Sequence, residues 1–358
     1  MNNVSVSSYN SRRFINFTGK KTSQPINSAD QFLSDVDKNV KSMENGNFFS
    51  RYLWSPTAIY ASFIPFAGYG FYNLAKLWSL KKAERMLEHD TVLSKFHKRF
   101  PVGLVASLVA VAGLQYIFSL NSDKKLEKFQ QDFKEINTKT DARLRDQVIR
   151  SSMIGAMCSP MCGEVTFNKN LVMDPISRRK LKKLIKHELV HAGQYETIAR
   201  SENGIKKLNY AVLKSTSKLM SNPKASAEIE AIYQDIINDK TGKYENITVR
   251  MVGTDVDFKK YIIAIHTLNT NKDAGFDDIP MVIDELHYEK VREEKGALTQ
   301  EQEQKAQQYY QAQIDYPPLT FWNMINPFSP YYNNLLEREA YKESPNLITR
   351  FRHLFVKD

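Results

Sequence analysis

Two histidines one helical turn apart, with a glutamate directly after the first, are the residues of this chain best placed to do chemistry. They are His187, Glu188 and His191, in the stretch LIKHELVHAGQ over residues 184–194. Residues four apart on a helix share a face, so both imidazoles project to the same side. Two such nitrogens can bind one Zn²⁺ at about 2.0–2.1 Å. A carboxylate beside the metal can then take a proton from a water molecule.

The residues around this motif have the pattern of a helix with one buried face. No proline interrupts the motif, and the positions between and after the histidines are uncharged. The apolar stripe consists of Leu181, Leu184, Ile185, Leu189, Ala192 and Tyr195. Asp174 followed by Pro175 at the first helical position predicts where the helix begins, and Gly204 predicts where it has ended. The motif is therefore expected on a long, partly buried helix.

The His-Glu-x-x-His pattern resembles the zinc metallopeptidases known as zincins. The resemblance covers residues 162–194, with a second patch near residues 331–341. It implies a long active-site helix beside a small sheet, a zinc-bound water and a third protein ligand downstream. It also implies that an edge strand before the helix binds the substrate backbone. Glu164–Phe167, which alternates in polarity, is the expected strand; residues 168–170 are expected to turn and 171–173 to continue extended.

Two glutamates compete to be the third ligand. Glu337 shares a helix face with Ala340 and Tyr341, and the pattern Tyr-x-Asn-x-x-Glu-x-Glu-Ala-Tyr around it looks like the late glutamate helix of bacterial zincin-like proteins. Glu228 lies nearer to His191 in the sequence, at the edge of an apolar stripe on a second predicted helix. The resemblance favours Glu337, and Glu228 remains the alternative.

These residues together predict a peptide-bond hydrolase that acts on a protein or peptide substrate. Zn²⁺ on His187, His191 and Glu337 lowers the pKa of its water to about 7. Glu188 takes the proton as the water attacks, and then delivers it to the leaving amine. Single histidines are usually surface or packing residues, and His266, His287 and His353 are interpreted in that way.

Composition and charge limit the partners of the chain. It has 358 residues and a net charge of +10, but no Lys/Arg run alternates with aromatic residues, so no nucleic-acid groove is expected. Anionic lipid fits the basic charge equally well. The only cysteines, Cys158 and Cys162, are too few for a disulfide framework and are expected to be small buried residues.

Two uncharged, largely apolar stretches, 52–75 and 100–122, are each longer than the about 20 residues that span a bilayer. A basic link over 76–99 joins them. This pattern predicts a two-helix membrane hairpin that anchors the protein in lipid. The link and the segment before the hairpin hold equal numbers of Lys and Arg, so the positive-inside rule does not assign a side to the catalytic domain.

The expected fold class is α+β and mostly helical. Residues 1–50 are predicted to be a flexible polar tail with a short helix over 29–43, residues 51–122 the membrane hairpin, and residues 123–358 a zincin-like domain with an insertion over 241–328. A charged helix is expected over 124–150. Residues 247–252 and 260–265 are expected to be strands or short helices, and 301–313 a polar helix that caps the cleft.

Two hypotheses from other functional classes remain open at this point. In the first, the protein is a membrane-hairpin adaptor whose zinc site is structural or degenerate, which predicts a closed site with four ligands. In the second, the histidine motif is coincidental and the basic charge binds lipid or a partner, which predicts membrane binding that weakens with salt.

Overall fold

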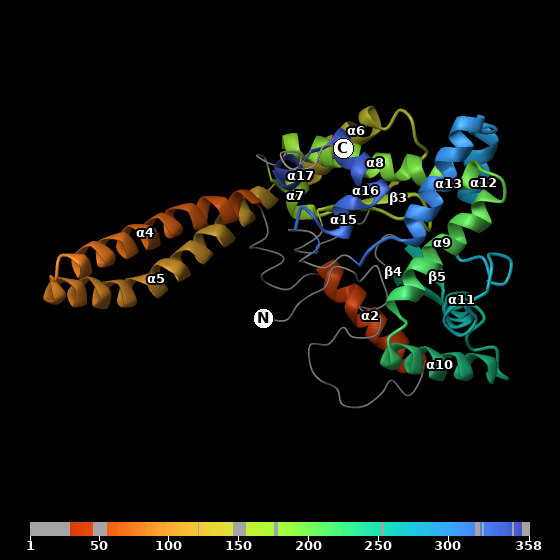
Figure 1. The fold of residues 1–358 in the computed structure, drawn as a ribbon, viewed down its shortest axis with the longest axis horizontal. Helices are drawn as coiled ribbons and strands as arrows, with labels where there is room; N and C mark the ends of the chain where they lie inside the picture. The colour runs from red at the N-terminus through yellow and green to blue at the C-terminus, as the bar shows by residue number, and fades with distance from the viewer. Residues whose placement is uncertain are drawn as a thin grey trace.

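The structure, a computed structural model, describes residues 29–45, 56–120, 122–145, 155–174, 178–251, 254–318, 323, 326–345 and 347–352. These residues are mostly helical, with one three-stranded and one two-stranded sheet, which confirms the predicted α+β, mostly helical class. Two long helices form an arm that extends away from a body containing the other elements (Figure 1).

The long helix expected around the histidine motif is α8 (Arg178–Arg200), and it runs through the body. Its apolar stripe is buried apart from the half-buried Leu184, and Ile185 is fully inaccessible. It packs against the next helix, α9 (Gly204–Leu219), and against three helices that follow much later in the chain. These are α12 (Glu285–Lys295), α13 (Gln300–Ile314) and α16 (Leu335–Glu343). Contacts on several sides hold the motif rigidly in place.

The two ends of α8 differ in part from the expectation. Pro175 lies outside the described residues, and Asp174 is the C-cap of a short preceding helix, α7 (Lys169–Met173). At the other end, α8 stops at Arg200, and the chain turns at Asn203, whose φ is 54°. Gly204 therefore begins α9 directly. A Cβ atom there would lie 2.1 Å from the carbonyl oxygen of Ile198, so only glycine allows the two helices to meet this closely.

The three-stranded sheet has the order β1-β3-β2. In it, β1 (Arg143–Leu144) is parallel and β2 (Ala156–Cys158) antiparallel to β3 (Glu164–Phe167). The expectation that Glu164–Phe167 is an edge strand is wrong, because the two-residue strand β1 pairs with its other side. The outer strand beside α8 is β2. Asn168 then caps α7 by accepting a hydrogen bond from the Asn170 N–H, so residues 171–173 are helical rather than extended.

The charged helix expected over 124–150 is shorter than predicted. It is α6 (Ser122–Ile136), and directly after it the side chain of Asn137 donates to the carbonyl of Ala142. Its apolar face, Phe129 and Phe133, packs edge-on against Phe167 of β3. This contact fastens the sheet to the helical layer.

Residues 241–328 contain further parts of the body. Residues 248–251 form β4 (Thr248–Met251), which pairs with β5 (Thr254–Asp257). Residues 260–265 belong to a helix, α11 (Phe258–Thr270), which packs against α10 (Pro223–Ile237). Val256, Ile262 and Tyr288 of this region are inaccessible to solvent and belong to the same apolar core as α8.

The helix expected in the N-terminal segment is α2 (Ala29–Asn45). It packs against β4 and α10, and the ring of Phe32 lies 5.5 Å from that of Phe258. Residues 29–45 are therefore attached to the body rather than part of a flexible tail. Residues 1–28 and 46–50 lie outside the described residues.

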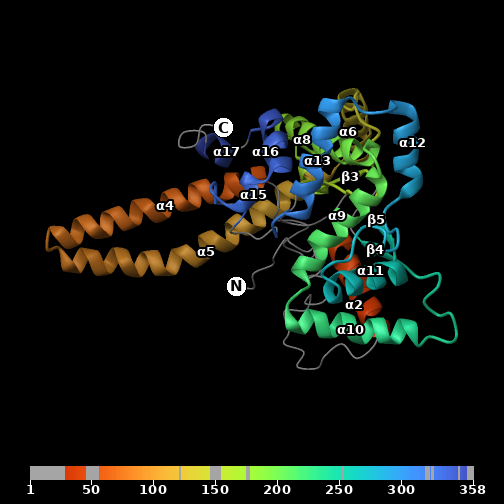
Figure 2. The same cartoon turned by 45° about the vertical axis from the view of Figure 1, so that its right-hand side comes forward.

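The arm consists of α4 (Pro56–Lys82) and α5 (Met86–Ser119), which pack side by side and are joined by a tight turn at the far end (Figures 1 and 2). A helical hairpin is therefore present where one was expected. However, none of the helices within the described ranges is long and apolar enough to cross a membrane. The prediction of a membrane-spanning hairpin, and of a membrane location inferred from it, is wrong.

The composition of the two arm helices explains this correction. The uncharged stretches are only parts of longer helices: α4 continues through Lys76 to Lys82, and the first half of α5 is charged up to Arg99. Within the first stretch, 52–75, prolines, tyrosines, glycines and serines lower the mean hydropathy. Apolar side chains are nonetheless exposed along the arm; the most accessible include Leu87, Phe71, Trp78, Val102 and Val109.

Candidate metal centre

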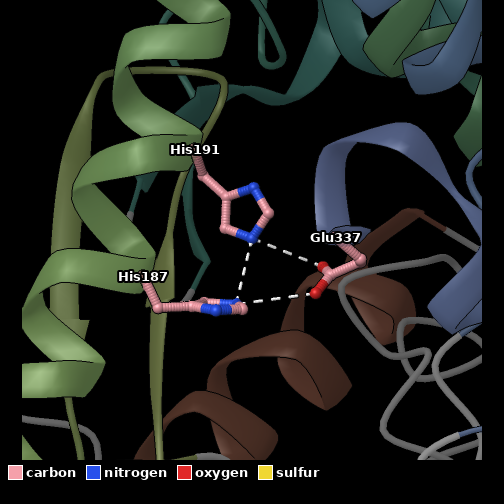
Figure 3. A group of neighbouring side chains, drawn as sticks. All are labelled: His187, His191 and Glu337. Atoms are coloured by element: carbon pink, nitrogen blue, oxygen red, sulfur yellow. Dashed lines mark hydrogen bonds and ion pairs between the residues drawn. The ribbon is translucent and has the colours of Figure 1, made fainter. Parts of the chain in front are cut away.

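His187, His191 and Glu337 converge on one point (Figure 3). Both histidines project from α8, and the glutamate reaches them from α16, which packs directly against that helix. All three side chains are buried. Their nitrogen and oxygen atoms lie within 4.8 Å of one another, so the group can bind a metal ion. Among the described residues, no fourth His, Cys, Asp or Glu joins it.

The distances between the nitrogen and oxygen atoms of these side chains are close to those between the ligands of a tetrahedrally coordinated ion. The Nε2 atoms of His187 and His191 are 3.2 Å apart. Glu337 places Oε2 at 3.5 Å from the first nitrogen and Oε1 at 3.4 Å from the second. Bonds of about 2.0–2.1 Å at tetrahedral angles set ligand atoms about 3.3–3.4 Å apart. Each nitrogen thus lies at about one ligand–ligand distance from the other nitrogen and from one oxygen of the carboxylate.

The hydrogen bonds of Gln194 determine which nitrogen of His191 carries the proton. The Gln194 side-chain nitrogen donates to the Leu336 carbonyl at 3.1 Å and to Glu339 Oε2 at 3.4 Å. Its oxygen therefore faces His191 Nδ1, at 3.0 Å. Because an amide oxygen only accepts, Nδ1 must be the donor. In neutral His191 the free electron pair is then on Nε2, directed at the shared point.

His187 is oriented by the end of α16. Ser344 Oγ donates to the Ala340 carbonyl at 3.3 Å. It therefore accepts from His187 Nδ1, which lies 3.1 Å away. In neutral His187 the nitrogen that carries the lone pair is therefore again Nε2. Tyr341 supports the same ring, with a ring-to-ring separation of 4.5 Å. A ligand whose second nitrogen is fixed in this way is the arrangement that holds metals in proteins.

The charge at this point favours a cation. Burial opposes ionisation of Glu337, but its interactions with His191, His187 and the hydroxyl of Tyr316 outweigh burial and lower the pKa of this carboxyl to about 2. Burial disfavours the charged form of His187 as well, yet the neighbouring carboxylate raises its pKa. Burial lowers the pKa of His191. Oε2 of Glu337 is buried and receives no hydrogen bond from the described residues. A buried carboxylate oxygen without a donor is the kind of atom that a metal ion satisfies.

Glu188 is buried beside the three ligands without joining them. Burial raises the pKa of its carboxyl to about 7, and the backbone N–H of Cys158 on β2 hydrogen-bonds to it. The outer strand of the sheet thus holds this carboxyl from one side while α8 presents it from the other. It is the arrangement expected for a group that exchanges a proton near a metal rather than ligating it.

The other sequence candidates lie elsewhere. Glu228, the alternative third ligand, is buried on α10 and is not part of the group; its nearest charged partner is Lys224, 3.9 Å away. His266 stacks on Tyr233 and contacts Glu230 at 2.6 Å. His287 lies on α12, and His353 falls outside the described residues. Cys158 and Cys162 are buried, as expected, and are not joined in a disulfide.

Three residues that contact the ligands were not identified from the sequence: Gln194, Ser344 and Tyr316. Gln194 had a local signal, since it lies three residues after His191 on the same helix face. Ser344 and Tyr316 lie far from α8 in the sequence and approach it only in the folded protein. A comparison with known protein families, curated proteins and solved structures finds no match.

Proposed function

We propose that this protein is a zinc-dependent peptide hydrolase. The observation that carries the proposal is the convergence of two oriented imidazoles and a buried carboxylate on one point, with a second buried carboxyl, Glu188, beside it. Two histidines and one glutamate are a known donor set of catalytic zinc, which keeps one position open. A structural zinc site would close with a fourth protein ligand.

The donor set alone also suits iron, which two histidines and one carboxylate bind in oxygenases. The position of Glu188 favours hydrolysis over oxygen chemistry. A carboxyl held next to the metal by a helix and by a strand N–H has a direct role in moving a proton from water. Such a group has no comparable role in binding dioxygen. The hydrolase is therefore the function that the site supports best.

Each residue of the site has a separate role in the proposed reaction. His187, His191 and Glu337 would hold the ion, which when bound polarises a substrate carbonyl and acidifies water. Glu188 takes a proton from the attacking water and passes it to the leaving amine, so that the peptide bond breaks without a free anion leaving. Gln194 and Ser344 keep both imidazoles in the orientation in which Nε2 faces the ion.

The experiment compares the wild type with Glu188→Gln. Zinc is measured by elemental analysis of the purified full chain, and hydrolysis with a library of quenched fluorescent peptides. We expect zinc in both proteins and peptide hydrolysis in the wild type only, because the amide of glutamine cannot accept the proton. We expect the rate to fall by a factor of at least about 10²–10⁴, the usual contribution of a general base.

The matched control is Glu202→Gln, which removes an exposed carboxylate just after α8 and should alter neither property. If the purified wild type contains no zinc after it has been dialysed against a zinc solution, the metal assignment is overturned. Zinc binding together with peptide hydrolysis that survives Glu188→Gln would overturn the proposed role of Glu188. Tightly bound iron in place of zinc would favour the oxygenase alternative.

A further inference from the structure

Tyr316 reaches the candidate metal centre from a segment with no recognisable motif. It follows α13 directly, and its N–H donates to the carbonyl of Gln313 at 3.2 Å. Its ring packs edge-on against Tyr331, with ring centroids 6.4 Å apart. Its hydroxyl donates a hydrogen bond to Oε1 of Glu337. The phenol is therefore held from behind by backbone and ring contacts while its hydroxyl faces the carboxylate.

The two oxygens of Glu337 consequently have different surroundings. Oε1 accepts from Tyr316, whereas Oε2 is buried without a hydrogen-bond donor among the described residues. Oε2 is also the oxygen 3.5 Å from His187 Nε2, a distance too long for a good hydrogen bond. The hydroxyl of Tyr316 thus uses one oxygen of the carboxylate and leaves Oε2, which has no hydrogen-bond donor in the described part of the chain, as the oxygen better placed to meet a cation.

The segment that carries Tyr316 is itself tied to α16. Asn334, the N-cap of α16, donates from its side chain to the carbonyl of Ala312 near the end of α13, at 2.8 Å. The end of α13 and the start of α16 are thus joined by a direct hydrogen bond. This link fixes the hydroxyl of Tyr316 relative to the glutamate that it contacts.

We propose that Tyr316 is a positioning residue that holds Oε1 of Glu337 and so presents Oε2 to the metal ion. The proposal rests on the metal site of the proposed function and is independent of the reaction carried out there. Groups that hydrogen-bond to metal ligands typically change metal affinity about 10–100-fold when they are removed. The phenol contributes through the geometry and charge of the glutamate, without touching the ion.

The first test measures zinc affinity by competition with a chromophoric chelator, using the full chain. Tyr316→Phe keeps the ring and removes only the hydroxyl, and we expect zinc to bind about 10–100-fold more weakly. The matched control is Tyr288→Phe, since Tyr288 is also buried and its hydroxyl donates to a backbone carbonyl, that of Pro160, at 2.8 Å. The control should leave the affinity unchanged. Circular dichroism and thermal melting establish that each variant is folded.

A second test asks whether Tyr316 acts through Glu337. Tyr316→Phe is combined with Glu337→Ala, which leaves no acceptor for the phenol, and zinc affinity is measured in both backgrounds. We expect the loss caused by Tyr316→Phe to disappear once the carboxylate has gone. The same fold-loss in both backgrounds would mean a general structural role and would overturn the proposal.

The outcomes separate this proposal from the function on which it rests. A folded Tyr316→Phe protein with wild-type zinc affinity would overturn the role of Tyr316 and leave the metal site intact. A wild type that does not bind zinc would overturn both. Should Tyr316→Phe not fold, Asn334→Ser provides the test, because serine can still cap α16 but loses the hydrogen bond to the Ala312 carbonyl that ties down the segment carrying the phenol, and it should weaken zinc binding in the same direction.

Discussion

At the residue scale, the site is defined by hydrogen bonds behind the ligands as much as by the ligands. His187 and His191 could be predicted from the sequence because their spacing is a local property of a helix. The choice between Glu337 and Glu228 could not be made from the residues alone. Both are glutamates on amphipathic helices, and only the packing of α16 against α8 brings one of them to the histidines. The resemblance to zincins favoured the glutamate that the structure places there.

The role of Gln194 gives a prediction at this scale. Gln194→Met keeps the length of the side chain but cannot accept from His191 Nδ1, so the ring loses the partner that fixes its proton and orientation. We expect zinc affinity to fall about 10–100-fold, measured by chelator competition. Gln307→Met, on the exposed face of α13, is the control and should not change it. Unchanged affinity in folded Gln194→Met would show that His191 is oriented by packing alone.

At the element scale, the sequence predicted helices correctly where apolar residues recur at helical spacing. It did not predict which strands pair when the strands are far apart in the chain. The apolar stripe of α8 could be read directly, and so could the hairpin of long helices. The central position of β3 could not, because its second partner, β1, has only two residues and no pattern of its own. Asn168 shows a smaller failure of the same kind: it was interpreted as a turn residue, but it caps a helix.

The packing of α2 gives a prediction at the element scale. Phe32 is almost inaccessible and lies in the main core, so Phe32→Ala leaves a cavity at the junction with α11. We expect the free energy of unfolding to fall by about 3–5 kcal/mol, measured by urea denaturation. Ser34→Ala, an exposed position on the same helix, should have little effect. A loss below about 1 kcal/mol would mean that α2 contributes little to the stability of the body.

At the scale of the whole molecule, the arm shows why a hydropathy argument was misleading. Counting uncharged residues identified two apolar segments correctly but not the helices to which they belong. Each helix extends well beyond its segment into charged sequence, and the apolar part of α4 also contains proline, tyrosine, glycine and serine. Segment length alone is therefore weaker than the composition of the complete helix, which depends on where the turn falls.

Buried tyrosines predict how the stability of the whole molecule responds to alkaline pH. Burial raises the pKa of Tyr261 and Tyr288 above the ordinary value of 10.0. Because the folded-state pKa is the higher one, their contribution to stability is complete below the unfolded-state pKa and is lost as pH rises through the folded-state pKa. Each such tyrosine lowers the free energy of unfolding by about 1.4 kcal/mol per pH unit above pH 10.

The measurement is urea denaturation from about pH 8 to pH 11, with the release of tyrosinate followed by ultraviolet absorbance. In Tyr288→Phe the free energy of unfolding should fall less steeply with rising pH, because one buried tyrosine no longer ionises. Tyr72→Phe, at an exposed position on the arm, is the control and should leave the decline as it is. Equal declines in wild type and Tyr288→Phe would contradict the prediction.

The separation of the ligands along the chain has a consequence for how the protein matures. Two donors sit on one helix and are available as soon as that helix forms, whereas the carboxylate arrives only when α16 has docked against it. Two imidazoles alone make a weak site, so tight capture of the ion must follow the joining of distant segments rather than guide it. The time course of metal uptake during refolding would then report when α16 docks against α8.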